Sequence, residues 1–222
     1  MTSPLSLILF DVDGTLVDSQ AHIFGAMVSA FESQDLPVPP KSDVLSIVGL
    51  SLFEAFGVLR PDLDDAKRDA LVAAYKNSFM SMRQDRTPSP LYPGARACLD
   101  QLGLIDEYLL GVATGKSRRG LDHVLRAHDL GGKFVTEQVA DFHPSKPHPA
   151  MAQAALDASG AERGVMIGDT TYDMEMGRAA GLKTIAVTWG YHPVADLRPL
   201  ADVVVDRFAE LAPAIKHLWG NA

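Results

Sequence analysis

Short apolar runs separated by longer stretches of helical spacing form the main pattern along the chain. The first run, at 5–10, has no helical face and ends in DVDG, which predicts a buried strand leading into a loop. Because helical patterns lie between most of the runs, we predict a doubly wound parallel sheet with helices on both faces. The other runs lie at 108–113, 165–167, 184–188 and 203–205, with a weaker one at 134–135.

Helix start and stop residues support this alternation in the second half of the chain. Ser117 is placed to cap a helix that carries apolar side chains at 121, 124 and 125. An alanine-rich segment at 150–158 follows Pro149 and stops at Gly160, and a further helical pattern at 172–180 stops at Gly181. We therefore expect three helices in these places.

The stretch from 19 to 91 breaks the alternation, since it contains only helical patterns. Apolar positions at 24, 27, 28 and 31 form one helical stripe, and Ser51 with Glu54 matches a capping box at the start of another helix. Prolines at 88, 90 and 93 mark the return to the alternating part. We predict a helical cap domain at 18–91, inserted into a Rossmann-like α/β core made of 1–17 and 92–222.

Composition limits the partners and the compartment. The 222 residues carry a formal charge of −8, which argues against a nucleic-acid partner but not against small phosphorylated ligands. The single cysteine, Cys98, excludes an internal disulfide and lies in an apolar helical pattern, as expected of a buried thiol. With no apolar run near the ~18–20 residues of a membrane span and no signal-peptide pattern, we expect a cytoplasmic protein, monomeric or homodimeric, with no membrane partner.

Polar side chains gather where the predicted strands end. Asp11 and Asp13 follow the first strand, Thr114 follows the second, and Asp169 with Asp173 follows the fourth. In an open parallel sheet, ligands bind beyond the carboxyl ends of the strands, so we expect these groups at one edge of the sheet. Lys146, in the loop between the second and fourth of these strands, belongs to the same candidate site.

Electrostatics predict a cation at this edge. The four carboxylates of Asp11, Asp13, Asp169 and Asp173 repel one another or take up protons unless a positive charge joins them. Mg²⁺ binds such oxygen ligands together with phosphate oxygens, and Lys146 adds a second positive charge. We therefore predict a phosphate-binding site in which one of Asp11 and Asp13 is the nucleophile and the other transfers a proton, with Thr114 near the phosphoryl oxygens.

These motifs together resemble those of the haloacid dehalogenase superfamily of phosphohydrolases. The four motifs are DVDGTLVDS from Asp11, the Thr114 of VATGK, the Lys146 of KPHP, and GDTTYD from Gly168. They occur in order, and the helical insert after the first motif is similar to the type-one cap of that superfamily, so the resemblance covers the whole chain.

The resemblance implies a role for each motif residue. Asp11 attacks phosphorus and becomes an aspartyl-phosphate, while Asp13 first protonates the leaving oxygen and then activates water. The Asp11 carboxylate, the Asp13 backbone carbonyl and Asp169 hold Mg²⁺, with Asp173 acting through a metal-bound water. Thr114 and Lys146 hold the phosphoryl group.

Within the superfamily the chain resembles phosphoglycolate-phosphatase-like and pyrophosphatase-like members. The segments LYPG at 91–94, TWGY at 188–191 and GLSL at 49–52 carry this likeness. It implies hydrolysis of a small phosphorylated metabolite, with the substrate specificity loop in the cap. The substrate-binding residues expected are Gly49, Leu50, Ser51, Thr15 and Gly115.

Two alternatives remain open. A sugar phosphomutase of the same superfamily shares Asp11 and Asp13, but it typically carries a histidine at the place of Ile23 and another residue at the place of Thr15. A non-catalytic phosphate-binding regulator on this fold has no need of Asp13.

Overall fold

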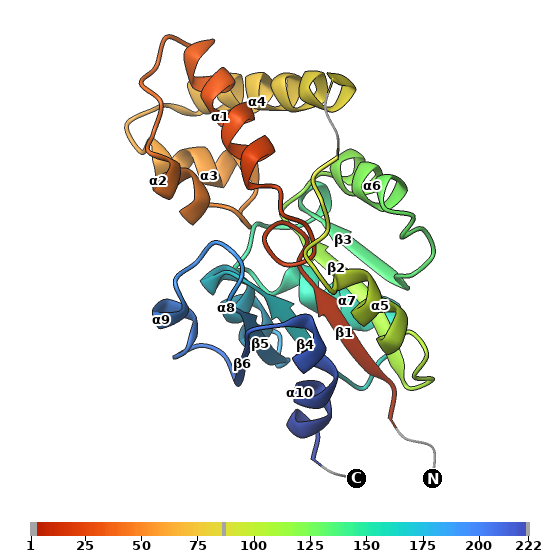
Figure 1. Ribbon diagram of the computed structural model, residues 1–222. Helices are drawn as coiled ribbons and strands as arrows, with labels where there is room; N and C mark the ends of the chain where they lie inside the picture. The colour runs from red at the N-terminus through yellow and green to blue at the C-terminus, as the bar shows by residue number, and fades with distance from the viewer. Residues whose placement is uncertain (1–3, 86–87, 221–222) are drawn as a thin grey trace.

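The computed structural model describes residues 4–85 and 88–220, with the side chains of 82–85 outside the description. Six strands form one sheet in the order β3-β2-β1-β4-β5-β6, and every neighbouring pair is parallel (Figure 1). This architecture confirms the predicted doubly wound α/β core. The strands are β1 (Ser6–Phe10), β2 (Tyr108–Thr114), β3 (Thr136–Val139), β4 (Arg163–Gly168), β5 (Lys183–Val187) and β6 (Val203–Val205).

Strand β1 lies at the centre of the sheet. All five of its residues are buried, because β2 and β4 pair with its two edges and helices cover both of its faces. In this register Leu9 lies between Gly111 of β2 and Met166 of β4. A strand buried on both faces favours a largely apolar run such as that at 5–10.

Two groups of helices cover the sheet. On one face, α5 (Ala95–Leu102), α6 (Arg118–Ala127) and α10 (Leu211–Leu218) pack over side chains such as Ile8 and Phe10. On the opposite face, α7 (Ala150–Ser159) and α8 (Thr171–Ala179) pack over Leu7 and Leu9. The shorter elements are the 3-10 turns η1 (Ala140–Phe142) and η2 (Phe208–Glu210) and helix α9 (Val194–Leu197).

The helix boundaries confirm most of the predicted start and stop residues. The Ser117 side chain accepts a hydrogen bond from the backbone N–H of Gly120 at the start of α6. Gly160 ends α7 with a left-handed backbone, φ 67°, a conformation that costs glycine nothing.

The predicted capping box at Ser51 and Glu54 is wrong. Ser51 does precede α3, but its side chain makes no capping bond, and its N–H donates to Ser145 Oγ at 2.8 Å. The capping box lies at Thr170 and Asp173 instead, at the start of α8. A tertiary contact thus replaces a local one at the first of these helix ends.

The expected strand at 134–135 is also displaced. Strand β3 begins two residues later, at Thr136. Phe134 is buried in the same apolar cluster as side chains of α6, whereas Val135 is exposed. The apolar signal at Phe134 therefore came from packing before the strand.

Four helices between β1 and α5 lie together beyond the carboxyl ends of the strands, at the top of Figure 1. They share their own apolar cluster, in which Phe31 packs on Phe56 with ring centroids 5.9 Å apart. They are α1 (Gln20–Glu32), α2 (Lys41–Ser46), α3 (Leu52–Leu59) and α4 (Asp65–Asp85). We call this group the cap helices.

The two segments that connect the cap helices to the sheet run side by side. Val17 and Leu91 form an isolated antiparallel bridge, and the N–H of Asp18 donates to the carbonyl of Pro90 at 2.9 Å. The domain boundaries at 17/18 and 91/92 fall on this bridge and remain a prediction. Within the described residues, we find no helix with both the length and the apolar character that a bilayer crossing requires.

Candidate active site

The candidate site lies where the winding of the sheet reverses, between β1 and β4. Chain connections lead from β1 toward β3 on one side and from β4 toward β6 on the other, so a crevice opens beyond the ends of these two strands. Asp11 follows β1, Asp169 follows β4, and Thr114 is the last residue of β2. The topology therefore brings these residues to one edge, as expected from their positions after strands.

Three buried carboxylates meet at this edge. One oxygen each from Asp11, Asp169 and Asp173 lies within 4.8 Å of the others. The ammonium of Lys146, which is 1% exposed, lies 2.7 Å from Asp11 Oδ1 and 2.6 Å from Asp173 Oδ1. Asp173 Oδ2 also accepts a hydrogen bond from the N–H of Thr170 at 3.1 Å, so the capping box of α8 orients this carboxylate. One ammonium thus joins two of the three carboxylates.

Burial dominates the electrostatics of the cluster. Desolvation raises the pKa of Asp11 to about 7, opposed by Lys146 and reinforced by Asp173 and Asp13. Desolvation also raises the pKa of Asp169 well above its usual range, with further contributions from Asp173 and Asp11. For Lys146, burial alone lowers the pKa, but the attraction of Asp11 and Asp173 outweighs it, and the net pKa is raised. The ammonium is therefore charged at neutral pH.

Asp169 is held by contacts from two loops, the one after β1 and the one after β5. Thr15 Oγ1 donates to Asp169 Oδ1 at 2.7 Å, and the N–H of Tyr191 donates to Oδ2 at 2.9 Å. Two glycines make room for the carboxyl, because a Cβ at Gly14 or Gly190 would lie 2.2 or 2.1 Å from Asp169 atoms. Gly14 also has φ +88°, which favours glycine. Thr15 thus contacts Asp169, and its predicted role in substrate binding stays a prediction.

The carboxylate cluster has the donors that a hard divalent cation requires. Asp11 Oδ2 is buried and has no hydrogen-bond partner among the described residues. All three side chains offer oxygen, and when ionised they carry more negative charge than the single positive charge of Lys146 balances. Hard cations such as Mg²⁺ take oxygen ligands of this kind. The residues that would hold such an ion are Asp11 and Asp169, with Asp173 beside them.

Asp13 lies apart from this cluster, so the structure gathers three of the four expected carboxylates. Asp13 Oδ1 accepts a hydrogen bond from Ser19 Oγ and lies 2.8 Å from Lys116 Nζ. Tyr191 Oη lies 3.1 Å from the same Ser19 hydroxyl. Neither Ser19 nor Lys116 was predicted as a site residue, although both lie within the motifs DVDGTLVDS and VATGK. Asp13 thus has its own cationic partner.

A cavity of about 520 Å³ lies between the strand ends and the cap helices. Asp11 and Asp13 both line it, together with Thr114 and Gly115 from the sheet side and Lys116 beside them. Gly49 and Leu50, two of the expected substrate-binding residues, line it from the cap side. Thr15 and Ser51 do not line this cavity.

The segment joining α2 to α3 lies close against Gly115. A Cβ there would lie 2.6 Å from the carbonyl oxygen of Gly49 and 2.7 Å from that of Leu50. A side chain at this position would displace the backbone of the cap loop. Gly115 therefore contributes to the site by the space it leaves rather than by a functional group.

Fold and site together define a class of protein, an α/β core with a buried carboxylate site at its strand ends, covered by a helical cap. The family model described as haloacid dehalogenase-like hydrolase matches residues 8–187. The chain belongs to this family, in agreement with the resemblance seen in its motifs.

Curated relatives align over nearly the whole chain. The probable phosphatase IndB of Dickeya dadantii is 34% identical over 220 residues, which covers 96% of this chain and 94% of that protein. Pyrophosphatase PpaX of Bacillus cereus strain AH820 is 28% identical over 218 residues, which covers 96% of this chain and 98% of that protein. The chain is accordingly a phosphatase of the haloacid dehalogenase-like family.

Solved structures agree on the fold. A predicted phosphatase from Clostridium acetobutylicum has a TM-score of 0.84 at 25% identity, covering 96% of this chain and 99% of that one. A predicted phosphoglycolate phosphatase from Haemophilus somnus has a TM-score of 0.79 at 23% identity, covering 97% and 100%. At 23% identity, the similarity to the Haemophilus somnus structure shows a shared fold and no more.

Proposed function

We propose that this chain is a Mg²⁺-dependent phosphatase that hydrolyses a small phosphate monoester through an aspartyl-phosphate on Asp11. The observation that carries the proposal is the buried Asp11 carboxylate, which lines the cavity while Oδ1 contacts Lys146 and Oδ2 lacks a partner among the described residues. A carboxylate in this setting combines an available oxygen with a neighbouring positive charge. Such carboxylates are known nucleophiles in phosphoryl transfer.

In the first step, an oxygen of Asp11 forms a bond to phosphorus and the bond from phosphorus to the leaving oxygen breaks. Asp13, which lines the same cavity, donates its proton to that leaving oxygen, and an alcohol departs. Lys116 lies 2.8 Å from Asp13 and supplies positive charge on the same side of the cavity. Thr114 lines the cavity where its hydroxyl can bind a phosphoryl oxygen.

In the second step, Asp13 takes a proton from a water molecule, whose oxygen forms a bond to phosphorus. The bond from phosphorus to Asp11 breaks, which restores the carboxylate and releases inorganic phosphate. Lys146 stays within 2.7 Å of Asp11 and compensates its charge when it is ionised. Bound by Asp11 and Asp169, Mg²⁺ would supply positive charge to the phosphoryl oxygens.

The cap helices would exclude bulk water from this reaction. The backbone of the segment joining α2 to α3 lies against Gly115 on the sheet side, and Tyr172 Oη donates to the carbonyl of Ser46 at 3.2 Å. Closure of such an element commits the substrate and shields the intermediate. The small-molecule partner, the cytoplasmic location and a monomeric or homodimeric state stay predictions.

An aryl phosphate assay with Mg²⁺, with EDTA and with two variants tests the proposal. We expect Asp11→Asn and EDTA to abolish release of phosphate, and Asp13→Asn to lower it by roughly 10²-fold or more. Asp43→Asn, an exposed carboxylate of α2, is the matched control and should retain activity. Activity that persists in Asp11→Asn would contradict the nucleophile assignment.

Two outcomes would favour the other candidates. Transfer of the phosphoryl group between positions of a hexose phosphate, without free phosphate, would indicate a mutase. Binding of phosphate without turnover of any ester would indicate a regulatory protein.

A further inference from the structure

We propose that the substrate's leaving group carries an extended apolar body, aromatic or alkyl, in place of a second charged group. This inference rests on the proposed phosphatase function, because it uses the same cavity and assumes that the phosphoryl group lies at Asp11. It specifies the substrate class that the function leaves open.

The two sides of the cavity differ in chemistry. The sheet side presents Asp11, Asp13, Thr114 and Lys116, which are the groups that a phosphoryl transfer needs. The cap side is largely apolar, with side chains from three helices and from the segment joining α2 to α3. Its members include Ile23, Met27, Ile47, Leu50, Tyr75 and Phe79. A bound ester would thus place its phosphate on the sheet side and its leaving group among these side chains.

The cavity is larger than a two-carbon leaving group needs. Its volume of about 520 Å³ falls within the roughly 300–1,000 Å³ typical of sites for drug-sized ligands. An apolar leaving group would be stabilised by removing its own surface and that of the cap side chains from water. A leaving group as small as glycolate would leave most of this apolar surface in contact with water.

Charge on the cap side is sparse. Within the described residues that line the cavity, the cap supplies a single charged side chain, Lys76, and it is exposed. Arg119 of α6 also lines the cavity and is exposed, while Lys116 is already paired with Asp13. A carboxylate or second phosphate placed among Ile23, Met27 and Leu50 would lose its hydration without gaining a cation.

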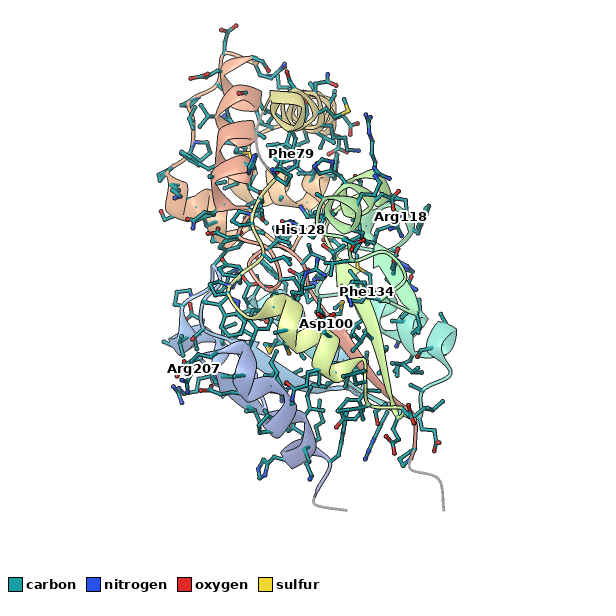
Figure 2. All side chains as sticks on the ribbon, turned by 45° about the vertical axis from the view of Figure 1, so that its right-hand side comes forward. Phe79, Asp100, Arg118, His128, Phe134 and Arg207 are labelled. Atoms are coloured by element: carbon teal, nitrogen blue, oxygen red, sulfur yellow. The ribbon has the colours of Figure 1, made fainter. Side chains whose placement is uncertain are left out.

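One wall of the cavity is aromatic. Tyr75 and Phe79 of α4 stack with ring centroids 5.7 Å apart and planes inclined by 24°. Phe79 lies on the part of the cap that faces the sheet domain (Figure 2), and Lys116 Nζ lies 5.5 Å from its ring centroid. Flat apolar surface beside the phosphate position suits an aromatic ring or an alkyl chain.

A series of n-alkyl phosphates from methyl to hexyl tests this directly, because the leaving alcohols differ little in acidity and mainly in apolar area. With the wild-type protein and Mg²⁺, we expect kcat/KM to rise roughly fourfold per added methylene, as transfer of buried methylenes from water predicts. The kcat/KM for hexyl phosphate should also exceed the values for 2-phosphoglycolate and pyrophosphate.

Two variants on the same helix connect the preference to the cavity. Ala55 lines the cavity and Val58 is exposed, so Ala55→Leu fills the site while Val58→Leu adds similar bulk to the surface. We expect Ala55→Leu to lower the hexyl-to-methyl ratio of kcat/KM at least tenfold, and Val58→Leu to leave it unchanged. Should Ala55→Leu fail to fold, Leu50→Ala should lower the same ratio by removing apolar contact.

The outcomes separate this inference from the function it rests on. A flat or falling profile from methyl to hexyl, or a preference for phosphoglycolate or pyrophosphate, overturns the apolar leaving group but leaves the phosphatase standing. Hydrolysis of none of the esters overturns the proposed function and this inference with it.

Discussion

The ammonium of Lys116 lies 2.8 Å from Oδ1 of Asp13, and the two side chains are only 9% and 12% exposed. The same ammonium lies 5.5 Å from the ring centroid of Phe79 in the cap. One cation therefore contacts the proposed acid and the cap helices together. Its loss should affect the chemistry more than the fold of either part.

Substitution of Lys116 by methionine keeps the apolar stem and removes the charge. We expect kcat/KM for an aryl phosphate to fall by roughly 10²-fold, because Asp13 loses the cation that holds it in place for proton transfer. Lys133→Met is the matched control, since Lys133 pairs with Asp100 in a more exposed position. That control should leave activity intact, and equal activity in both variants would contradict a role for Lys116.

Much of the site was predictable because parallel strands end at one edge of a sheet. Asp11, Thr114 and Asp169 each come directly at or after a strand end, so finding the strands was enough to bring them together. The partners of Asp13 were not predictable in this way. Ser19 and Lys116 reach it from two loops that only the folded chain places side by side.

Local helix signals were less reliable than strand positions. Ser51 and Glu54 have the spacing of a capping box, yet Ser51 uses its N–H to contact Ser145 across the cap boundary. Thr170 and Asp173 have the same spacing and do form the box. A local pattern does not show which competing tertiary contact prevails, and this is why the first assignment was wrong. In this box Asp173, which we propose lies near the metal, also caps the start of α8.

The contact of Thr15 with Asp169 leads to a second prediction. Thr15→Val removes the hydroxyl that donates to Asp169 Oδ1 at 2.7 Å and leaves the carboxylate less firmly oriented. We expect the Mg²⁺ concentration for half-maximal activity to rise roughly 10–100-fold, as for other residues that orient metal ligands. The measurement is a Mg²⁺ titration of phosphatase activity.

Two controls accompany the Thr15 variant. Thr15→Ser keeps the hydroxyl and should restore most of the Mg²⁺ affinity. Thr188→Val removes an exposed hydrogen bond to Asp206 and should leave the titration unchanged. If Thr15→Val were instead to raise KM for the ester with unchanged Mg²⁺ dependence, Thr15 would be a substrate contact, as first expected.

The buried charge of Lys146 leads to a third prediction, which concerns the stability of the protein without metal. Two carboxylates raise its pKa, so its stabilising charge is present below the unfolded value of 10.5 and is lost only in alkaline solution. In Lys146→Met, Asp11 loses the neighbour that lowers its pKa, which is already about 7. Ionisation of Asp11 then destabilises the variant increasingly as pH rises from 3.8 through the raised pKa.

Urea denaturation in EDTA at pH 5 and pH 8 measures this effect. The free energy of unfolding of Lys146→Met should fall below the wild-type value by about 3–5 kcal/mol at pH 8, and by less at pH 5. Lys183→Met breaks an exposed pair with Asp202 and should cost under about 1 kcal/mol at either pH. If Lys146→Met lowered the free energy of unfolding equally at pH 5 and pH 8, ionisation of Asp11 would not be the cause.

Cys98 allows a pH prediction outside the active site. Its thiol is 5% exposed in α5, and burial raises its pKa to about 12 from 9.0. The folded chain therefore keeps the proton while the unfolded chain loses it, so stability falls as pH rises above 9, by up to about 1.4 kcal/mol per pH unit. Cys98→Ala should lack this contribution, and the difference in free energy of unfolding between the two proteins, measured by urea denaturation, should change sharply from pH 8 to pH 10.5.

A thiol reagent at pH 8 should label Cys98 in guanidinium but not in the native protein, and rapid native labelling would show that the thiol is accessible.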